Sequence, residues 1–173
     1  MVKRFACLVT GLVLTGVPAH ALTVLTADKQ AVFRTGSALV RVGGDRALAS
    51  LVDPTCPSGL ASTLQVSAYL QATARVAAGP VIPLQCANWR RTHAGFVYRD
   101  KAHRIVYSRD KLQIQLGGTG YAFPGGPVGY VELWLNVGTT RLLTRLHAFR
   151  KNDATQLVTR KPSSAAAICS FLS

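Results

Sequence analysis

The residues of this chain that could do chemistry are a Ser–Lys pair, a few carboxylates and an aromatic group in the C-terminal half. Ser108-Arg109-Asp110-Lys111 matches the S-x-x-K spacing of serine acylating enzymes, in which the serine opens a helix in a cleft. Here the four residues lie between two alternating runs, which predicts a tight turn instead. No H-E-x-x-H, G-x-S-x-G or phosphate-loop motif occurs. The sequence therefore predicts a protein without a catalytic set and without a cofactor.

Acidic residues are scarce in this chain. Asp and Glu total 7 against 20 Lys and Arg, and Glu132 is the only Glu. Because the Asp residues lie mostly at predicted turns, nothing supports the paired carboxylates of a glycosidase. The formal net charge of +13 falls to +11 once Lys3 and Arg4 leave with the signal sequence described below. This excess favours an anionic glycan or lipopolysaccharide as partner, with nucleic acid less favoured, or else it serves solubility alone.

The number and spacing of the cysteines limit which disulfide bonds the chain can form. Three follow the predicted signal sequence: Cys56, Cys86 and Cys169. We expect a disulfide between Cys56 and Cys86, because both lie at the edges of predicted strands in one half of the chain. The alternative is a bond from Cys169 to either of the other two. No C-x-x-C occurs and the histidines have no ligand spacing, so no metal site is expected.

One hairpin can be set in register from the sequence. The alternating runs Val128–Val137 and Thr140–Phe149 flank Gly138-Thr139. Glycine at the first of two loop residues indicates a type II′ turn, so that the residues on either side of the loop pair with each other. This register places Glu132 opposite Arg145, a favourable cross-strand pair. A shift by one residue would move Glu132 opposite a core position.

The face of this hairpin that points away from the core is the best candidate binding surface. Aromatic rings stack on sugar faces, and guanidinium groups bind carboxylates or phosphates. The alternative is that Trp134 and Leu143 pack under a loop or a neighbouring sheet, with Glu132 and Arg145 forming a peripheral ion pair. The register also places Tyr130 opposite His147 and Asn136 opposite Arg141. The candidate ligand-binding residues are Tyr130, Glu132, Trp134, Arg141, Arg145 and His147.

The first 21 residues have the pattern of a cleaved secretory signal peptide. Lys3 and Arg4 precede the apolar run Ala6–Val17, and Ala19-His20-Ala21 provides the small-x-small cleavage pattern. The apolar run is too short to span a bilayer permanently, and no later segment is apolar for long enough. We therefore expect a mature chain that starts at Leu22 and is secreted or periplasmic.

Two-residue alternation dominates the rest of the chain and predicts half-buried strands. Residues 22–173 are expected to form a single all-β domain, an antiparallel β-sandwich or a barrel-like meander. Phe96–Arg99, Arg104–Tyr107 and Lys111–Leu116 predict a meander with short turns. Ala38–Val42 and Ala47–Val52 flank a Gly-Gly-Asp turn and predict a first hairpin. A short C-terminal helix is expected over residues 163–168.

Four segments resemble segments of uncharacterised secreted bacterial β-rich proteins. They read DPTCP, LQCANW, GPVGYVE and FRKND, and they begin at Asp53, Leu84, Gly126 and Phe149. The resemblance extends from about Asp53 to Pro162 and implies a bacterial source, with the protein in the periplasm or outside the cell. It also favours the Cys56–Cys86 pair, and it implies no activity.

These features favour a secreted, non-enzymatic binding module for anionic or carbohydrate ligands. The alternative is a structural or assembly component of the cell envelope, joined to a partner protein through a free cysteine or an exposed strand edge. A small hydrolase whose site has no recognisable motif is a third interpretation.

Overall fold

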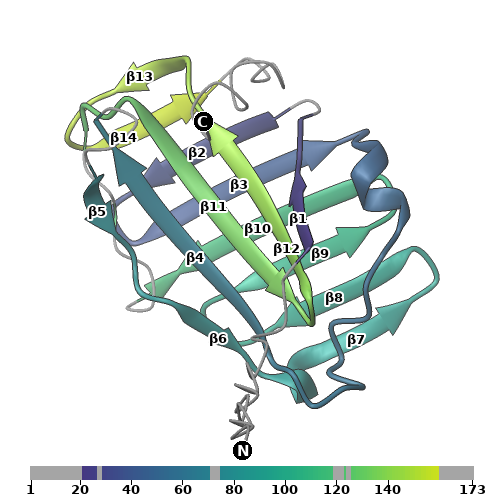
Figure 1. Cartoon of the computed structure of the whole chain (residues 1–173). Coiled ribbons are helices and arrows are strands. Elements are labelled where there is room, and N and C mark those ends of the chain that lie inside the picture. Colours follow the sequence, from purple (N-terminus) through teal and green to yellow (C-terminus); the bar gives the residue numbers. More distant parts are fainter. Residues whose placement is uncertain (1–20, 27–28, 71–74, 119–122, 124–125, 160–173) are drawn as a thin grey trace, which may run out of the picture.

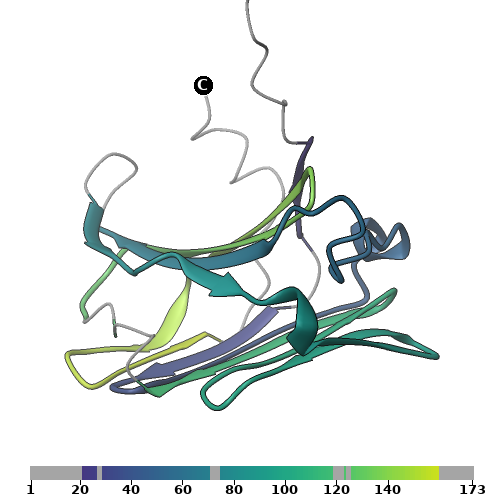
Figure 2. The same cartoon turned by 90° about the horizontal axis from the view of Figure 1, so that it is seen from below.

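Alternating apolar side chains build two β-sheets that pack face to face. The computed structural model describes residues 21–26, 29–70, 75–118, 123 and 126–159. Figure 1 shows the sheets one in front of the other, and Figure 2 shows them as two layers. The predicted all-β sandwich is confirmed. Residues 1–20 of the predicted signal peptide, Cys169 and the predicted C-terminal helix lie outside the described residues.

The first layer, sheet A, has the strand order β1-β12-β11-β4-β5, and β6 also pairs with β4. All its pairings are antiparallel except that of β1 with β12. Its outer side is concave in Figure 2. Its strands are β1 (Ala21–Val24), β4 (Ser62–Tyr69), β5 (Arg75–Ala78), β6 (Ile82–Leu84), β11 (Tyr130–Val137) and β12 (Thr140–Leu146).

The second layer, sheet B, has the order β13-β14-β2-β3-β10-β9-β8-β7 and is antiparallel throughout. It contains the predicted meander as β8, β9 and β10. Its strands are β2 (Lys29–Arg34), β3 (Ser37–Gly43), β7 (Trp89–Thr92), β8 (Gly95–Arg99), β9 (Arg104–Ser108), β10 (Lys111–Gly117), β13 (Phe149–Asn152) and β14 (Gln156–Thr159). Two 3₁₀ turns complete the described part, η1 (Arg46–Ala49) and η2 (Cys86–Asn88), and no helix there could span a membrane.

The inward-facing side chains of the two sheets form one hydrophobic core. In β10, Leu112 and Ile114 are buried, and Lys111 and Gln115 face the other way. In β11, Leu133 and other apolar residues at odd positions meet them from sheet A. Since each fully buried aliphatic side chain contributes about 1.5–3 kcal/mol, this alternation fixes which face of each sheet points inward.

The predicted register of the β11–β12 hairpin is confirmed. Gly138 has a φ of 55°, and Thr139 is not among the residues with positive φ, as a type II′ turn requires. Val137 pairs with Thr140, and Glu132 pairs with Arg145. The predicted continuation to His147 is wrong, because the ladder ends at Leu146.

The predicted hairpin of Ala38–Val42 with Ala47–Val52 is wrong. Ala38–Val42 belongs to β3, which pairs with β2 and β10. The following residues form η1 instead of a strand, because the Asp45 carboxylate accepts a hydrogen bond from the Ala47 backbone N–H at 2.9 Å. The same carboxylate accepts one from the Thr26 N–H at 2.5 Å. Side-chain capping therefore takes the backbone donors that a second strand would need.

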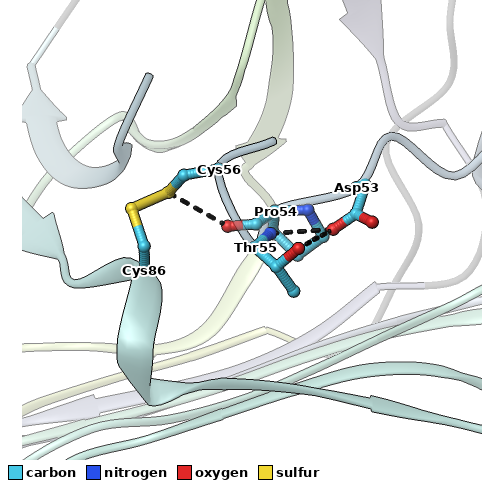
Figure 3. Close-up of a disulfide and its surroundings, with 5 residues drawn as sticks. All are labelled: Asp53, Pro54, Thr55, Cys56 and Cys86. Atoms are coloured by element: carbon cyan, nitrogen blue, oxygen red, sulfur yellow. Dashed lines mark hydrogen bonds between the residues drawn. A yellow bond between two sulfur atoms is a disulfide. The ribbon is translucent and has the colours of Figure 1, made fainter. Parts of the chain in front are cut away.

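The predicted disulfide between Cys56 and Cys86 is present, with the two Cα atoms 5.6 Å apart (Figure 3). It joins the loop before β4 to η2, which leads from β6 in sheet A to β7 in sheet B. The Asp53 carboxylate shapes this loop by accepting hydrogen bonds from the Thr55 N–H at 2.8 Å and the Thr55 hydroxyl at 2.6 Å. The bond thus fixes the position where the chain crosses between the sheets.

We expect the Cys56→Ala/Cys86→Ala variant to lose about 3–4 kcal/mol of unfolding free energy, because the bond closes a loop with a sequence separation of 30. Urea unfolding followed by tryptophan fluorescence measures this loss. Cys169→Ala is the matched control and should leave the midpoint unchanged. Equal stability of the double variant and the wild type would contradict the prediction.

Candidate functional site

The candidate site lies on the outer face of sheet A, at the centre of the sheet. β11 lies between β12 and β4, so that side chains from three strands meet there. Each strand contributes alternate residues, because successive side chains point to opposite faces. Trp134 of β11 has Gln65 of β4 and Leu143 of β12 as its Cα partners. Figure 2 shows that this face is concave, which brings the tips of neighbouring side chains together.

The Glu132–Arg145 pair is buried, and it is not peripheral. Both side chains are only 6% exposed. Arg145 donates from Nε to Glu132 Oε1 at 3.0 Å, and its Nη2 donates to the same oxygen. The Trp134 indole N–H donates to the other carboxylate oxygen at 3.1 Å. Three N–H donors thus hold the carboxylate, and the carboxylate in turn fixes the indole ring.

Two stacked tyrosines flank this ion pair. The rings of Tyr69 and Tyr130 are 4.6 Å apart and inclined by 8°, and the Arg145 guanidinium lies 4.8 Å from the Tyr130 ring centroid. Tyr130 has Tyr69 of β4 as its Cα partner. On the other side of β11, the ladder with β12 ends before the predicted pair of Tyr130 with His147. The strand breaks after Leu146, since Ala148 has a φ of 56°. Tyr130 and Arg145 are therefore buried residues that support the site.

Beside the buried group lies a polar hollow of about 250 Å³, here called the sheet A hollow. Arg141 lies over the Trp134 ring at 5.5 Å and donates from Nε to Asn136 Oδ1 at 3.0 Å. Asn136 donates in turn to the Thr63 hydroxyl at 2.8 Å. The hollow is lined by Gln65, Tyr69, Glu132, Trp134, Asn136 and Arg141.

The predicted site residues thus divide into three groups. Glu132, Trp134 and Arg141 line the sheet A hollow, and Trp134 and Arg141 are half-buried there. Tyr130 and Arg145 are buried next to it. His147 is half-buried beyond the end of β12, outside the hollow. Leu143 is fully buried, as the alternative of packing predicted for both residues. Trp134 is only half-buried and can contact a ligand.

Sequence reasoning missed Lys29, which is buried at the start of β2. Its ammonium group donates to the Arg145 backbone oxygen at 3.4 Å. Two residues earlier in β12, the Leu143 backbone oxygen accepts a hydrogen bond from the Leu25 N–H. Burial lowers the pKa of Lys29 to about 8, against an opposing effect of Asp45. Alternation in β2 was the available signal, since it places Lys29 on the same face as the buried Ala31 and Phe33.

His147 belongs to the same basic group as Lys29. Burial and the positive charges of Lys29 and Arg145 hold the pKa of His147 below its ordinary value. This imidazole is therefore neutral at physiological pH.

The S-x-x-K motif forms the turn between β9 and β10, as predicted. The Ser108 hydroxyl donates to Asp110 Oδ1 at 2.7 Å and to the Lys111 backbone oxygen at 3.1 Å. These hydrogen bonds hold the turn, and Ser108 is buried. A hollow of about 840 Å³ adjoins this turn and includes Arg91 and Arg109. It is lined by the ends of β7 and β8 and by the segments that connect strands there.

Asp100 and His103 form a second titratable cluster, in the turn between β8 and β9. Asp100 accepts hydrogen bonds from the Tyr98 hydroxyl at 2.8 Å, from the Ala102 N–H at 2.8 Å and from the His103 ring at 3.0 Å. Burial raises the pKa of Asp100, but the bonds from His103, Ala102 and Tyr98 outweigh it and bring the pKa to about 2. The cluster stabilises the turn, and no set of three metal-ligating side chains exists within the described part of the chain.

No family model, curated protein or solved structure matches this chain.

We expect Arg145→Met to lower the unfolding free energy by about 3–5 kcal/mol, because it leaves the Glu132 carboxylate buried without its cation. Glu132→Leu/Arg145→Met should recover more than half of that loss, because a well-packed apolar pair replaces both charges. The half-buried Arg141→Met is the matched control, with an effect of about 1 kcal/mol or less. Urea unfolding measures all three, and an Arg145→Met protein as stable as the wild type would contradict a buried pair.

We also expect the protein to gain stability as the pH rises from about 8 towards 10.5, because folding lowers the pKa of Lys29 and the unfolded chain then holds more protons. Below pH 8 the cost of burying the charge is fully present. Lys29→Met should remove this rise, on the order of 2–3 kcal/mol. Unfolding free energy is measured against pH for the wild type and for Lys29→Met. The difference between these two curves separates the effect of Lys29 from the effects of Tyr98 and Tyr107, whose pKa values burial raises. Parallel curves across this range would contradict the assignment.

Proposed function

We propose that this protein is an exported, non-enzymatic binding module that takes an acidic carbohydrate on the outer face of sheet A. The observation that carries the proposal is the convergence of an indole ring, a guanidinium group and two side-chain amides in the sheet A hollow. Export rests on the signal-peptide pattern of residues 1–21.

The polar groups of the hollow have bonding capacity left for a ligand. Arg141 uses only Nε within the described structure, toward Asn136, so its two terminal Nη groups can bind a carboxylate in bidentate fashion. Gln65 donates from Nε2 to the Gly79 backbone oxygen at 3.1 Å, which leaves its side-chain oxygen to accept from a hydroxyl. A uronic acid presents a carboxylate and hydroxyls together.

The size of the hollow favours one unit of a longer chain. Its volume of about 250 Å³ is below the ~300–1,000 Å³ of ordinary small-molecule pockets. One sugar ring with its carboxylate fits such a space, and neighbouring units would extend along the concave face seen in Figure 2. The Trp134 ring supplies the apolar platform on which a sugar face stacks.

Glu132 argues for binding without hydrolysis. Glycosidases use two carboxylates, one of which donates a proton. Here the carboxylate of Glu132 already accepts three N–H bonds, from Arg145 and Trp134, and the described residues that line the hollow include no second carboxylate. Glu132 thus positions Trp134 and does not act as an acid.

The test is affinity electrophoresis of the purified protein through gels containing polygalacturonate or neutral dextran, at low and high salt. We expect retardation by polygalacturonate that persists at high salt, and a loss of about tenfold or more in affinity for Arg141→Gln and for Trp134→Leu, because each removes a direct ligand contact. Both variants should keep the wild-type thermal midpoint within a few degrees.

Arg46→Gln is the matched control, since it removes the same charge from the exposed η1 turn, away from the hollow. It should change the affinity less than twofold. Retardation that disappears at high salt, or equal effects of Arg46→Gln and Arg141→Gln, would show that net charge alone causes binding and would overturn the proposal. Covalent dimers through Cys169 without glycan binding would favour the envelope-assembly alternative.

A further inference from the structure

The outer face of sheet B carries basic side chains without any acidic ones. Its strands contain no Asp or Glu. Alternation with the buried core residues places six exposed cations on the outward side of β2, β3, β7, β8, β9 and β10. We call this surface the basic face, and its cations are Arg34, Arg41, Arg90, Arg99, Arg104 and Lys111.

These cations have no carboxylate partner within the described part of the chain. The four ion pairs there involve other basic residues: Arg91, His103, Arg145 and Lys151. Arg34 donates to the neutral Gln156 side chain at 3.3 Å. Arg99 and Arg104 are direct Cα partners on adjacent strands, and like charges in that position destabilise a sheet. The fold therefore contains a like-charged pair, and an external anion bound there would reduce the repulsion between the two guanidinium groups.

The side chains between the cations narrow the chemistry of that anion. Half-buried aliphatic residues, the buried Gln113 and the half-buried Gln115 fill the centre of the face; the aliphatic residues are Val32, Leu39, Val97 and Val106. No aromatic side chain projects from the outward positions of these six strands. Stacking on bases, which single-stranded nucleic acid binding uses, is therefore unavailable there. The partner must be recognised by charge.

The arrangement of the cations is two-dimensional. They lie on six adjacent strands, and strands about 4.8 Å apart give a width of roughly 24 Å. No described segment crosses over this layer in Figure 2. A single polyanion chain would contact one row of such charges, whereas a lipid surface presents phosphates in two dimensions.

We propose that the basic face of sheet B docks flat on an anionic phospholipid surface. Guanidinium groups would contact lipid phosphates at the rim of the face, and the aliphatic centre would rest at the headgroup level. Because Val97, Val106 and their neighbours are half-buried, the contact is peripheral and reversible by salt. This inference goes beyond the proposed function, since it concerns the opposite layer of the sandwich.

The test is cosedimentation of the protein, purified from the exported fraction, with vesicles of phosphatidylglycerol and phosphatidylcholine or of phosphatidylcholine alone. We expect binding to the anionic vesicles only, weaker at roughly 1 M than at 0.1 M salt. Arg41→Gln/Arg99→Gln/Arg104→Gln should reduce the binding about 100-fold, given about a fivefold loss for each cation near the surface. Its thermal midpoint should equal or exceed that of the wild type, because the repulsive pair is gone.

The matched control is Arg46→Gln/Lys101→Gln/Arg109→Gln, which removes the same charge from exposed residues in the turns and η1. Its binding should fall less than tenfold. An equal loss in both triple variants, binding to neutral vesicles, or no wild-type binding would each overturn the proposal. So would retention on polyphosphate or single-stranded DNA in the absence of vesicle binding, which would assign the face to a linear polyanion. Polygalacturonate retardation of the first triple variant reports separately on the sheet A hollow.

Discussion

The turn at Gly138 sets the arrangement on which both faces of sheet A depend. Its φ of 55° allows a two-residue loop, and this loop fixes the register of β11 against β12. Leu133 then enters the core, and Glu132 meets Arg145 on the other side. A shift by one residue would place the only Glu of the chain against the core without its cation. Turn geometry, core burial and charge pairing therefore require the same register.

The two outer faces differ because the few carboxylates of the chain have other roles. Asp45, Asp53, Asp110 and Asp153 each accept hydrogen bonds from neighbouring residues in a turn or a cap. Among the carboxylates of the described residues, Glu132 alone lies on a sheet face, and it compensates Arg145. Since turn formation occupies these aspartates, the strands of sheet B retain their cations without counter-charges. The outer face of sheet A thus holds one compensated ion pair, whereas the cations of the basic face of sheet B have no carboxylate partner within the described part of the chain.

Local patterns predicted the parts of the fold that depend on local interactions. Alternation and a glycine turn sufficed for the β11–β12 register, and the spacing of Cys56 and Cys86 relative to the strands indicated their disulfide. The first predicted hairpin failed because the Asp45 side chain caps η1, an interaction that competes with strand pairing.

The remaining features depend on contacts between distant parts of the chain. Lys29 and Arg145 are separated by 116 residues, so no local pattern shows that Lys29 is buried against β12. The basic face likewise depends on strand order: β3 and β10 are neighbours, although they are far apart in sequence. Arg90 and Arg91 are adjacent in the sequence. Only the register shows that Arg90 points outward with Arg99 and Arg104, while Arg91 lies over Phe96 at 5.5 Å.

Solubility does not account for the distribution of positive charge. A net charge keeps proteins apart wherever it lies, and the hydrophobic core already requires the exposed cations of the sheet B strands to point outward. Neither solubility nor core burial favours Arg99 directly opposite Arg104, where the repulsion reduces stability. An external anionic surface accounts for this pair, since it converts each cation into a contact. With sheet B on such a surface, the concave outer face of sheet A points away from it (Figure 2). The sheet A hollow would then be open to a ligand while the protein is bound.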